Sequence, residues 1–174
     1  TATTNDGYTF LGWFNGETSV YATENYTFNV SETIMLTAKW STNVYNIEYE
    51  LNGGVHSEDN VAKYTVETQT IKLQNPTRDG YTFNGWYTES NFVNKVTAII
   101  PGTYGNKTLY AKWTPIPYTI TYQLNGGTQN SANVSQYNIE SNTITLKNPT
   151  REHYTFDGWY TESNFVNKVT QITK

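Results

Sequence analysis

The side chains that carry out most protein chemistry are scarce in this sequence of 174 residues. There is no cysteine, and the two histidines, His56 and His153, lie far apart in the chain. A zinc site or a nucleophile activated by histidine needs several such groups together. The 15 acidic residues are scattered and form no Asp-x-Asp loop for calcium and no pair suited to glycoside hydrolysis. We therefore expect no catalytic residue, no metal ligand and no cofactor.

Aromatic side chains are abundant, with 15 Tyr, 7 Phe and 5 Trp, and exposed rings are a common platform for sugars and proteins. Tyr87 and Tyr160 are the better candidates for facing a ligand. Each follows a nearby glycine, Gly85 or Gly158, that would disturb the alternation of a strand and turn the ring outward. The alternative, which we favour, is that the repeated rings form the cores of small domains. The ligand-binding residues are therefore left as unknown.

These rings belong to a sequence repeat that occurs more than twice in the chain. The sequence superposes on itself at a shift of 73 residues. The clearest landmark occurs as GYTFLGW at 7–13, GYTFNGW at 80–86 and HYTFDGW at 153–159. Residues 45–97 match residues 118–170 at 34 of 53 positions. Neither histidine is repeated, since His56 corresponds to Gln129 and His153 to a glycine in both other copies.

Short joints after each AKW sequence, at Ser41–Val44 and Thr114–Pro117, divide the chain into three parts. We predict the C-terminal part of a first repeat plus linker (1–44), a complete middle repeat plus linker (45–117) and a third repeat lacking its last strand (118–174). We expect the parent protein to be longer than this segment.

Composition favours strands and argues against two classes of partner. Thr, Asn and Tyr contribute 30, 21 and 15 residues, a mix suited to strands joined by Asn and Gly turns. A net charge of −4 with 11 basic residues gives little attraction to a phosphate backbone, so we expect no nucleic acid partner. No run of 18 apolar residues occurs that could insert in a membrane as a helix.

Within the middle repeat, alternation and turn residues predict four strands and two short helices. The strands are expected at 45–51, 70–73, 81–86 with a break or bulge at Gly85, and 108–113. Residues 118–124 repeat the first strand. The helix candidates are Ser57–Tyr64 and Ser90–Val96. The core is expected to consist mainly of Tyr49, Leu51, Phe83, Trp86, Leu109 and Trp113.

The combined pattern YxIxYxLNGG, NPTRxGYTFxGWY and LYAKW resembles the Listeria-Bacteroides repeat, also called the internalin B-repeat family. The resemblance covers nearly the whole chain in three copies. It implies a β-rich α+β fold of small β-grasp (ubiquitin-like or SUMO-like) domains, strung in tandem in secreted or wall-attached bacterial surface proteins and without enzymatic activity. His153 in place of glycine, and NGETSVYATE at 15–24, depart from the pattern and put a shared binding surface in doubt.

The stretch GWYTESNFVNKVT is identical at 85–97 and 158–170. It predicts either a repeated partner-binding strip or a recent tandem duplication, and we favour duplication. Lys39 and Lys112 offer amines for a Lys–Asn isopeptide crosslink of the kind found in surface stalks. Both should point away from the Ala-Trp face of their strand, so we expect them to be solvent-exposed.

The preferred functional hypothesis is a non-catalytic spacer or stalk segment of an extracellular protein at the bacterial cell surface, acting in adhesion, with flanking repeats as its partners. The alternative is a module that binds a host protein or glycan through exposed aromatic side chains or a sheet edge. A third possibility is that incomplete terminal repeats of different chains complement one another.

Overall fold

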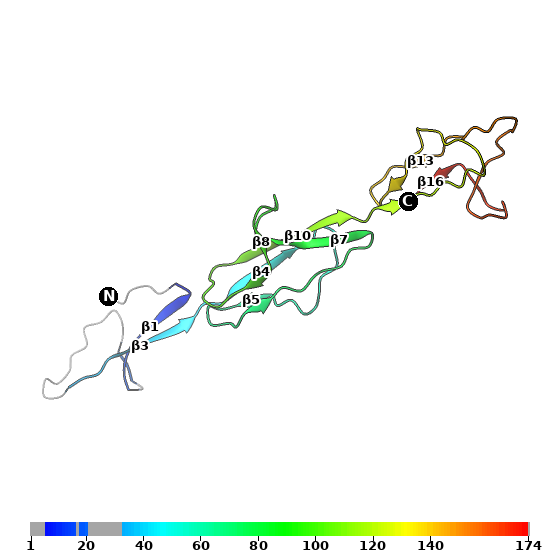
Figure 1. Cartoon of the computed structure of the whole chain (residues 1–174). Helices are drawn as coiled ribbons and strands as arrows, with labels where there is room; N and C mark the ends of the chain where they lie inside the picture. The colour runs from blue at the N-terminus through cyan, green and yellow to red at the C-terminus, as the bar shows by residue number, and fades with distance from the viewer. Residues whose placement is uncertain (1–5, 17, 21–32, 174) are drawn as a thin grey trace. The chain divides into compact units, whose positions relative to one another are not determined.

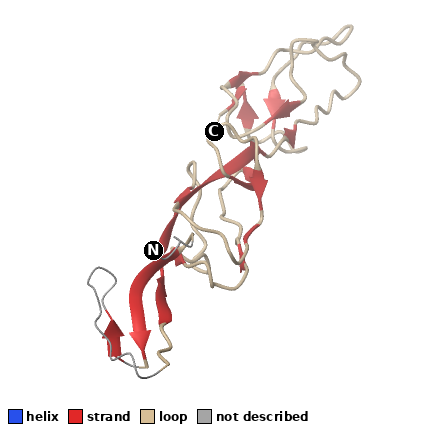
Figure 2. Ribbon diagram, turned by 90° about the vertical axis from the view of Figure 1, so that its left-hand side faces the viewer, coloured by secondary structure: helices blue, strands red, loops and turns tan. Residues whose placement is uncertain are grey.

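The structure is a computed structural model that describes residues 6–16, 18–20 and 33–173 (Figure 1). It divides into two units. Unit 1 contains Thr1–Thr77 and Phe83–Lys112, and unit 2 contains Arg78–Thr82 and Trp113–Lys174. The described ranges hold strands and loops and no helix, so none of them contains a helix able to span a membrane (Figure 2). The β-rich prediction is confirmed.

The part of unit 1 that precedes the first joint is a three-stranded antiparallel sheet of order β2-β1-β3. Its strands are β1 Tyr8–Asn15, β2 Thr18–Val20 and β3 Thr37–Thr42. The pairing of β1 with β3 shifts register between Phe10 and Gly12. Gly12 has a φ of 132°, as Gly85 has 131° in the middle repeat, which supports the bulge expected at this position. Residues 17 and 21–24 of the divergent segment 15–24 lie outside the described residues.

The middle repeat forms a five-stranded sheet of order β5-β4-β10-β7-β8. Its strands are β4 Tyr45–Glu50, β5 Lys63–Tyr64, β7 Tyr81–Tyr87, β8 Lys95–Val96 and β10 Lys107–Pro115. The first and last strands, β4 and β10, are parallel neighbours and pair from Ile47 opposite Lys107 to Glu50 opposite Tyr110. The outer pairs β4–β5 and β7–β8 are antiparallel. All four predicted strand regions of this repeat are confirmed, the second as β6, Ile71–Lys72, which pairs with β9, Ala98–Ile99.

The third repeat, in unit 2, contains three two-stranded antiparallel sheets, β11–β12, β13–β16 and β14–β15. Their bounds are β11 Tyr118–Thr119, β12 Gln136–Tyr137, β13 Ile144–Thr145, β14 Trp159–Tyr160, β15 Lys168–Val169 and β16 Gln171–Ile172. The strand predicted at 118–124 therefore extends only to Thr119.

The helix predicted at Ser57–Tyr64 is wrong. Its residues form a turn and then strand β5, because β4 uses their backbone groups. Ala62 accepts a hydrogen bond from the Ile47 N–H at 2.8 Å, and the Val61 carbonyl accepts one from the Tyr49 hydroxyl at 3.0 Å. A carbonyl that pairs with a neighbouring strand supports sheet structure in place of the helical ladder. The Ser-Glu-Asp sequence at 57–59 opens a turn and caps no helix.

The helix predicted at Ser90–Val96 is also wrong, because this segment is the loop of the β7–β8 hairpin followed by β8. Phe92 has a φ of 58° and lies in the left-handed region, which a right-handed helix cannot include. With neither helix present in the described residues, the α component of the expected α+β class is absent there. The helix of a β-grasp domain is likewise not seen.

The core of the middle repeat lies mainly between the sheet and the loops that cross it. Trp86 and Leu109 are 2% and 1% exposed, which confirms two of the predicted core residues. The other four, Tyr49, Leu51, Phe83 and Trp113, are half-buried. The remaining buried apolar residues are Ile47, Tyr64, Val66, Leu73, Ile99 and Ala111. The aliphatic contribution to the core is therefore larger than the aromatic-rich composition indicates.

Asn60 is the buried polar residue at the centre of this repeat, with 8% exposure. Its side-chain Nδ2 donates to the Gln74 carbonyl at 3.1 Å, and its Oδ1 accepts from the Gln74 N–H at 2.8 Å. The same Gln74 carbonyl also accepts the indole N–H of Trp86 at 2.9 Å. One backbone position thus holds a loop residue and the largest core side chain. We call these three residues the Asn60 anchor.

The anchor is repeated in the third repeat. Asn133 exchanges two hydrogen bonds with the backbone of Lys147, at 2.9 and 2.7 Å, and the Trp159 indole donates to the Lys147 carbonyl at 3.2 Å. Because lysine replaces glutamine at the central position, the side chain there is dispensable and the backbone groups carry the interaction.

Replacing Trp86 with alanine should destabilise the middle repeat by about 3 to 5 kcal/mol, because it removes a fully buried ring and the rings of Tyr49 and Phe83 lose the edge contacts they make with it. Thermal unfolding of the variant checks this, with Tyr104→Ala as a control at a ring that is 52% exposed. Equal midpoints for Trp86→Ala and the unchanged chain would contradict the packing described here.

Replacing Asn60 with alanine should cost about 1 to 3 kcal/mol, because it leaves the buried N–H and carbonyl of Gln74 with fewer partners. Gln74→Lys, the residue that the third repeat carries, should change the free energy of unfolding by less than about 0.5 kcal/mol. Denaturant unfolding of both variants measures the difference. A larger loss for Gln74→Lys than for Asn60→Ala would show that the side chain of residue 74 matters more than its backbone.

Candidate functional site

The β7–β8 hairpin contains the first candidate ligand-facing residue, Tyr87, at the end of β7. Its ring is half-buried and makes an edge contact with Phe92, with centroids 5.6 Å apart. The Lys112 ammonium lies 5.4 Å from the centroid of each of these rings, within cation–π range. Tyr87 is therefore part of a packed aromatic group, and one face of that group is covered by a cation of the same repeat.

Tyr160 has an equivalent arrangement in the third repeat. Its ring contacts Phe165 edge-on at 5.5 Å, and the Lys168 ammonium lies 5.9 Å from its centroid. Its hydroxyl donates a hydrogen bond to Asp157, which raises the pKa of Tyr160 and lowers that of Asp157. Lys168 lies 3.7 Å from Asp157 and favours the ionised carboxylate further. Phe165 is 60% exposed, so this hairpin presents more apolar surface than its counterpart.

A lysine side chain of the same hairpin approaches Gly85 closely. A Cβ built at this position would lie 2.2 Å from the Cε of Lys95, and one at Gly158 would lie at the same distance from the Cε of Lys168. The aliphatic stem of each lysine therefore crosses the strand where the glycine leaves room. The glycine that suggested an outward-facing tyrosine accommodates a neighbouring lysine of the same hairpin.

The polar residues of the repeated strip are bonded to one another within the hairpin loop. Glu89 accepts hydrogen bonds from the Thr88 hydroxyl at 2.6 Å, from the Asn94 side chain at 2.8 Å and from the Asn94 N–H at 3.0 Å. These donors, the Thr88 hydroxyl foremost, lower the pKa of Glu89. Glu162 has the same partners in Thr161 and Asn167, and its pKa is lowered for the same reason.

This network gives the identical strip a structural role that the sequence analysis missed. The regular spacing Thr-Glu-x-x-x-x-Asn in both copies was the available signal, since a carboxylate and an amide five residues apart can close a loop. A loop fixed by its own hydrogen bonds explains identical polar residues without a partner. The strip remains a candidate for binding only through its exposed apolar residues, such as Val93 and Val166, each 67% exposed.

The lysines considered for an isopeptide crosslink differ in their surroundings. Lys39 is exposed and its ammonium lies 5.1 Å from the Phe14 ring centroid. Lys112 is half-buried over Tyr87 and Phe92, so its environment is more enclosed than expected. Both amines face aromatic rings, and rings hold a cation without supplying the amide that an isopeptide bond needs.

The two histidines lie in separate surroundings. His56 is exposed and its ring centroid lies 4.7 Å from that of Tyr49. His153 is exposed, has a φ of 64° and lies 3.3 Å from the Glu152 carboxylate. Among residues 6–16, 18–20 and 33–173, no group of three or more His, Asp or Glu side chains is placed to hold a metal ion.

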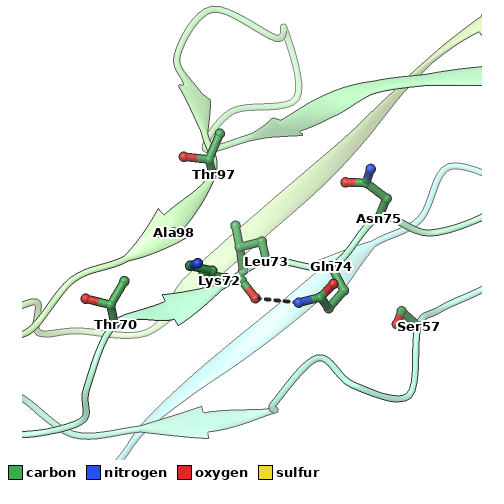
Figure 3. Close-up of a pocket in the computed structure, with 8 residues that line it drawn as sticks. All are labelled: Ser57, Thr70, Lys72, Leu73, Gln74, Asn75, Thr97 and Ala98. Atoms are coloured by element: carbon green, nitrogen blue, oxygen red, sulfur yellow. Dashed lines mark hydrogen bonds between the residues drawn. The ribbon is translucent and has the colours of Figure 1, made fainter.

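A polar hollow of about 620 Å³ lies beside β6 and β9 in unit 1 (Figure 3). It is lined by Ser57, Thr70, Lys72, Leu73, Gln74, Asn75, Thr97 and Ala98. Hydroxyl and amide groups predominate, and Gln74 Nε2 donates to the Lys72 carbonyl at 3.4 Å across it. This lining could hydrogen-bond a sugar or a peptide. The sequence analysis did not identify these residues as a site, because they come from four connecting segments and two short strands.

The Asn60 anchor recurs at Asn133 on the same 73-residue interval as the sequence, which marks the chain as a series of repeats. The chain belongs to the Listeria-Bacteroides repeat domain family, whose profile matches residues 45–112 and 118–174. Residues 1–44 match the divergent InlB B-repeat domain. Both matching families are repeat domains. No solved structure matches the chain significantly.

Relatives include larger proteins from two bacteria. Two proteins of Evansella cellulosilytica, both named as membrane proteins and one as Gly-rich, are 33% and 32% identical over 160 residues. These matches cover 89% and 90% of this chain but 18% and 24% of the relatives. Internalin H of Listeria monocytogenes is 30% identical over 154 residues, 82% of this chain and 26% of that protein. The chain thus spans 18 to 26% of the length of these relatives.

Acidification should loosen the hairpin loop, because the pKa of Glu89 is lowered in the folded protein. The ionised Glu89 stabilises the fold at pH values above the ordinary glutamate pKa, about 4.3, and this stabilisation is lost as the pH falls through the lowered pKa. The protection factor of the Asn94 amide, obtained from its exchange rate measured by NMR and corrected for the intrinsic pH dependence of exchange, should fall in this acid range. In Glu89→Gln the acid-dependent change should vanish, while Glu58→Gln should leave it intact. An unchanged profile in Glu89→Gln would contradict the role of Glu89.

Proposed function

We propose that this chain is a non-catalytic spacer segment of a bacterial cell-surface protein, in which linked repeats hold other domains at a distance. The observation that carries the proposal is the recurrence of the Asn60 anchor at Asn133, at a fixed interval of 73 residues, in repeats joined by segments of four residues. Compact units of about 70 residues are about 25 to 30 Å across. Adding a repeat therefore adds a fixed length.

We propose further that the chain is divided as 1–44, 45–117 and 118–174, and that the complete repeat is a variant of the β-grasp fold. A β-grasp sheet places its first and last strands side by side and parallel at its centre. The order β5-β4-β10-β7-β8, with β4 parallel to β10, supports this assignment. Loops between β5 and β7 take the place of the helix that crosses the sheet in that fold.

The extracellular location and the link to adhesion are part of the same proposal. They are supported by membership of a family named for internalin repeats and by relatives named Internalin H and membrane proteins. The expected neighbours in the parent protein are flanking repeats. The proposal includes no catalytic step and no cofactor, because the mapped hollow and hairpins present no activated nucleophile among the residues described above.

A spacer should lengthen in proportion to the number of repeats. Small-angle scattering on the 174-residue chain and on arrays with one and two added copies of residues 45–117 should give a maximum dimension that rises by about 25 to 30 Å per copy. A dimension that grows only as the cube root of the mass would indicate a compact globule and reject the spacer.

The polar hollow beside β6 and β9 favours a second candidate function, the binding of a host glycan or peptide. Four of its lining residues, Thr70, Leu73, Asn75 and Thr97, have the same residue type in the third repeat, at Thr143, Leu146, Asn148 and Thr170. A glycan array probed with the whole chain should then give a signal that Thr70→Val and Thr97→Val together reduce about tenfold. Tyr87→Ala is the matched test of the aromatic hairpin. No signal on any glycan, or one insensitive to all three changes, would reject the hollow as a glycan site.

A further inference from the structure

The same set of contacts occurs at two places 73 residues apart, each spanning a joint. In unit 1 the Tyr8 hydroxyl, before the joint at 41–44, donates to Oε1 of Glu67, after it, at 3.1 Å. In unit 2 the Tyr81 hydroxyl donates to Oε1 of Glu140 at 2.9 Å, across the joint at 114–117. Both tyrosines have a raised pKa: the hydrogen bond to Glu67 is the main cause at Tyr8, and burial followed by the hydrogen bond to Glu140 raises the pKa of Tyr81. The repetition indicates a built contact.

A glycine precedes each tyrosine and lies directly against an aliphatic side chain. A Cβ on Gly7 would lie 2.1 Å from Cγ1 of Val66, and a Cβ on Gly80 would lie 2.7 Å from Cδ1 of Ile139. The φ values of the two glycines are 85° and 77°. Glycine is therefore required at these positions for two reasons: the backbone φ is positive, and an aliphatic side chain occupies the space that a Cβ would need.

The joint itself is tied to the same glycine. The Asn43 N–H donates to the Gly7 carbonyl at 2.8 Å, and the Ile116 N–H donates to the Gly80 carbonyl at 2.9 Å. The turn that carries the aliphatic residue is also fixed. Thr65 N–H donates to the Thr68 hydroxyl at 2.8 Å, and in the other copy Asn138 N–H donates to the Ser141 hydroxyl at 2.9 Å.

We propose that the Gly-Tyr turn of one repeat is a docking site for a turn of the following repeat. The docked turn carries an aliphatic residue followed directly by an acidic residue. Val66-Glu67 and Ile139-Glu140 are the two occupants in this chain. Docking restrains bending at the joint, so the inference rests on the proposed spacer role for its purpose. The contacts themselves are tested independently of that role.

His153 provides a comparison within the chain. It occupies the position of Gly7 and Gly80, keeps a positive φ of 64° and carries a Cβ. An aliphatic side chain cannot seat on this turn as it does on the glycines. The residue at this position therefore decides whether a turn can receive a following copy in this manner.

The test uses the full 174-residue chain with Gly80→Ala and Gly80→His. Each should raise the hydrogen-exchange rate of the Ile116 amide about tenfold or more, because docking is lost and the joint opens. Gly105→Ala is the matched control, since Gly105 has a φ of 80° but open space around its Cβ position. It should leave the Ile116 rate unchanged. The Leu73 amide, bonded to the Thr97 carbonyl at 3.0 Å, reports whether the middle repeat stays folded.

A second variant tests the seated side chain without changing the glycine. Ile139→Ala removes the aliphatic atoms that lie against Gly80, and it should raise the Ile116 exchange rate in the same direction as Gly80→Ala. Equal effects of Gly80→Ala and Gly105→Ala at Ile116, or an unchanged Ile116 rate in Ile139→Ala, would overturn the docking site. Small-angle scattering from longer arrays tests the spacer role separately. A compact array in which the Ile116 amide is protected would reject the spacer role alone. An extended array in which the Ile116 exchange rate does not respond to Gly80→Ala would reject the docking site alone.

Discussion

The fold depends on one backbone position whose two hydrogen-bonding groups are shared between a loop and the core. The carbonyl of Gln74 accepts from both the Asn60 amide and the Trp86 indole, while its N–H donates to Asn60. An unpaired backbone N–H or carbonyl away from water destabilises the fold by more than a typical single hydrogen bond stabilises it. The position of the loop at 57–62 and the orientation of Trp86 are therefore fixed together, and the unit is organised without a helix.

The same constraint explains how a repeat with few aliphatic residues holds together. Trp86 packs against the edges of Tyr49 and Phe83, and the third repeat places Trp159 against Tyr122 and Phe156 in the same way. Trp159 is half-buried where Trp86 is fully buried. The ring geometry thus recurs in the third repeat, because the anchor and the aromatic pairs all lie within residues 49–86 and their equivalents at 122–159.

The sequence predicted the β class, the 73-residue interval and the family, because these rest on alternation and on exact repetition of many residues. It failed at Ser57–Tyr64 and Ser90–Val96, where the backbone is held by Asn60 and Glu89 side chains whose partners lie outside any helical periodicity. The candidate site fared similarly. Gly85 was read as turning Tyr87 outward, whereas the room it leaves is taken by Lys95. Such a contact depends on register between strands, which composition does not reveal.

The parallel pairing of β4 with β10 has a mechanical consequence. The chain enters the middle repeat at the start of β4 and leaves it at the end of β10, and the two strands run in the same direction. Tension applied through the neighbouring segments therefore pulls the strands lengthwise past each other. The hydrogen bonds from Ile47 to Glu50 are then loaded in shear and must break together, whereas bonds in an antiparallel hairpin pulled from its open end would break one at a time. A repeat of this topology resists stretching along its own chain direction.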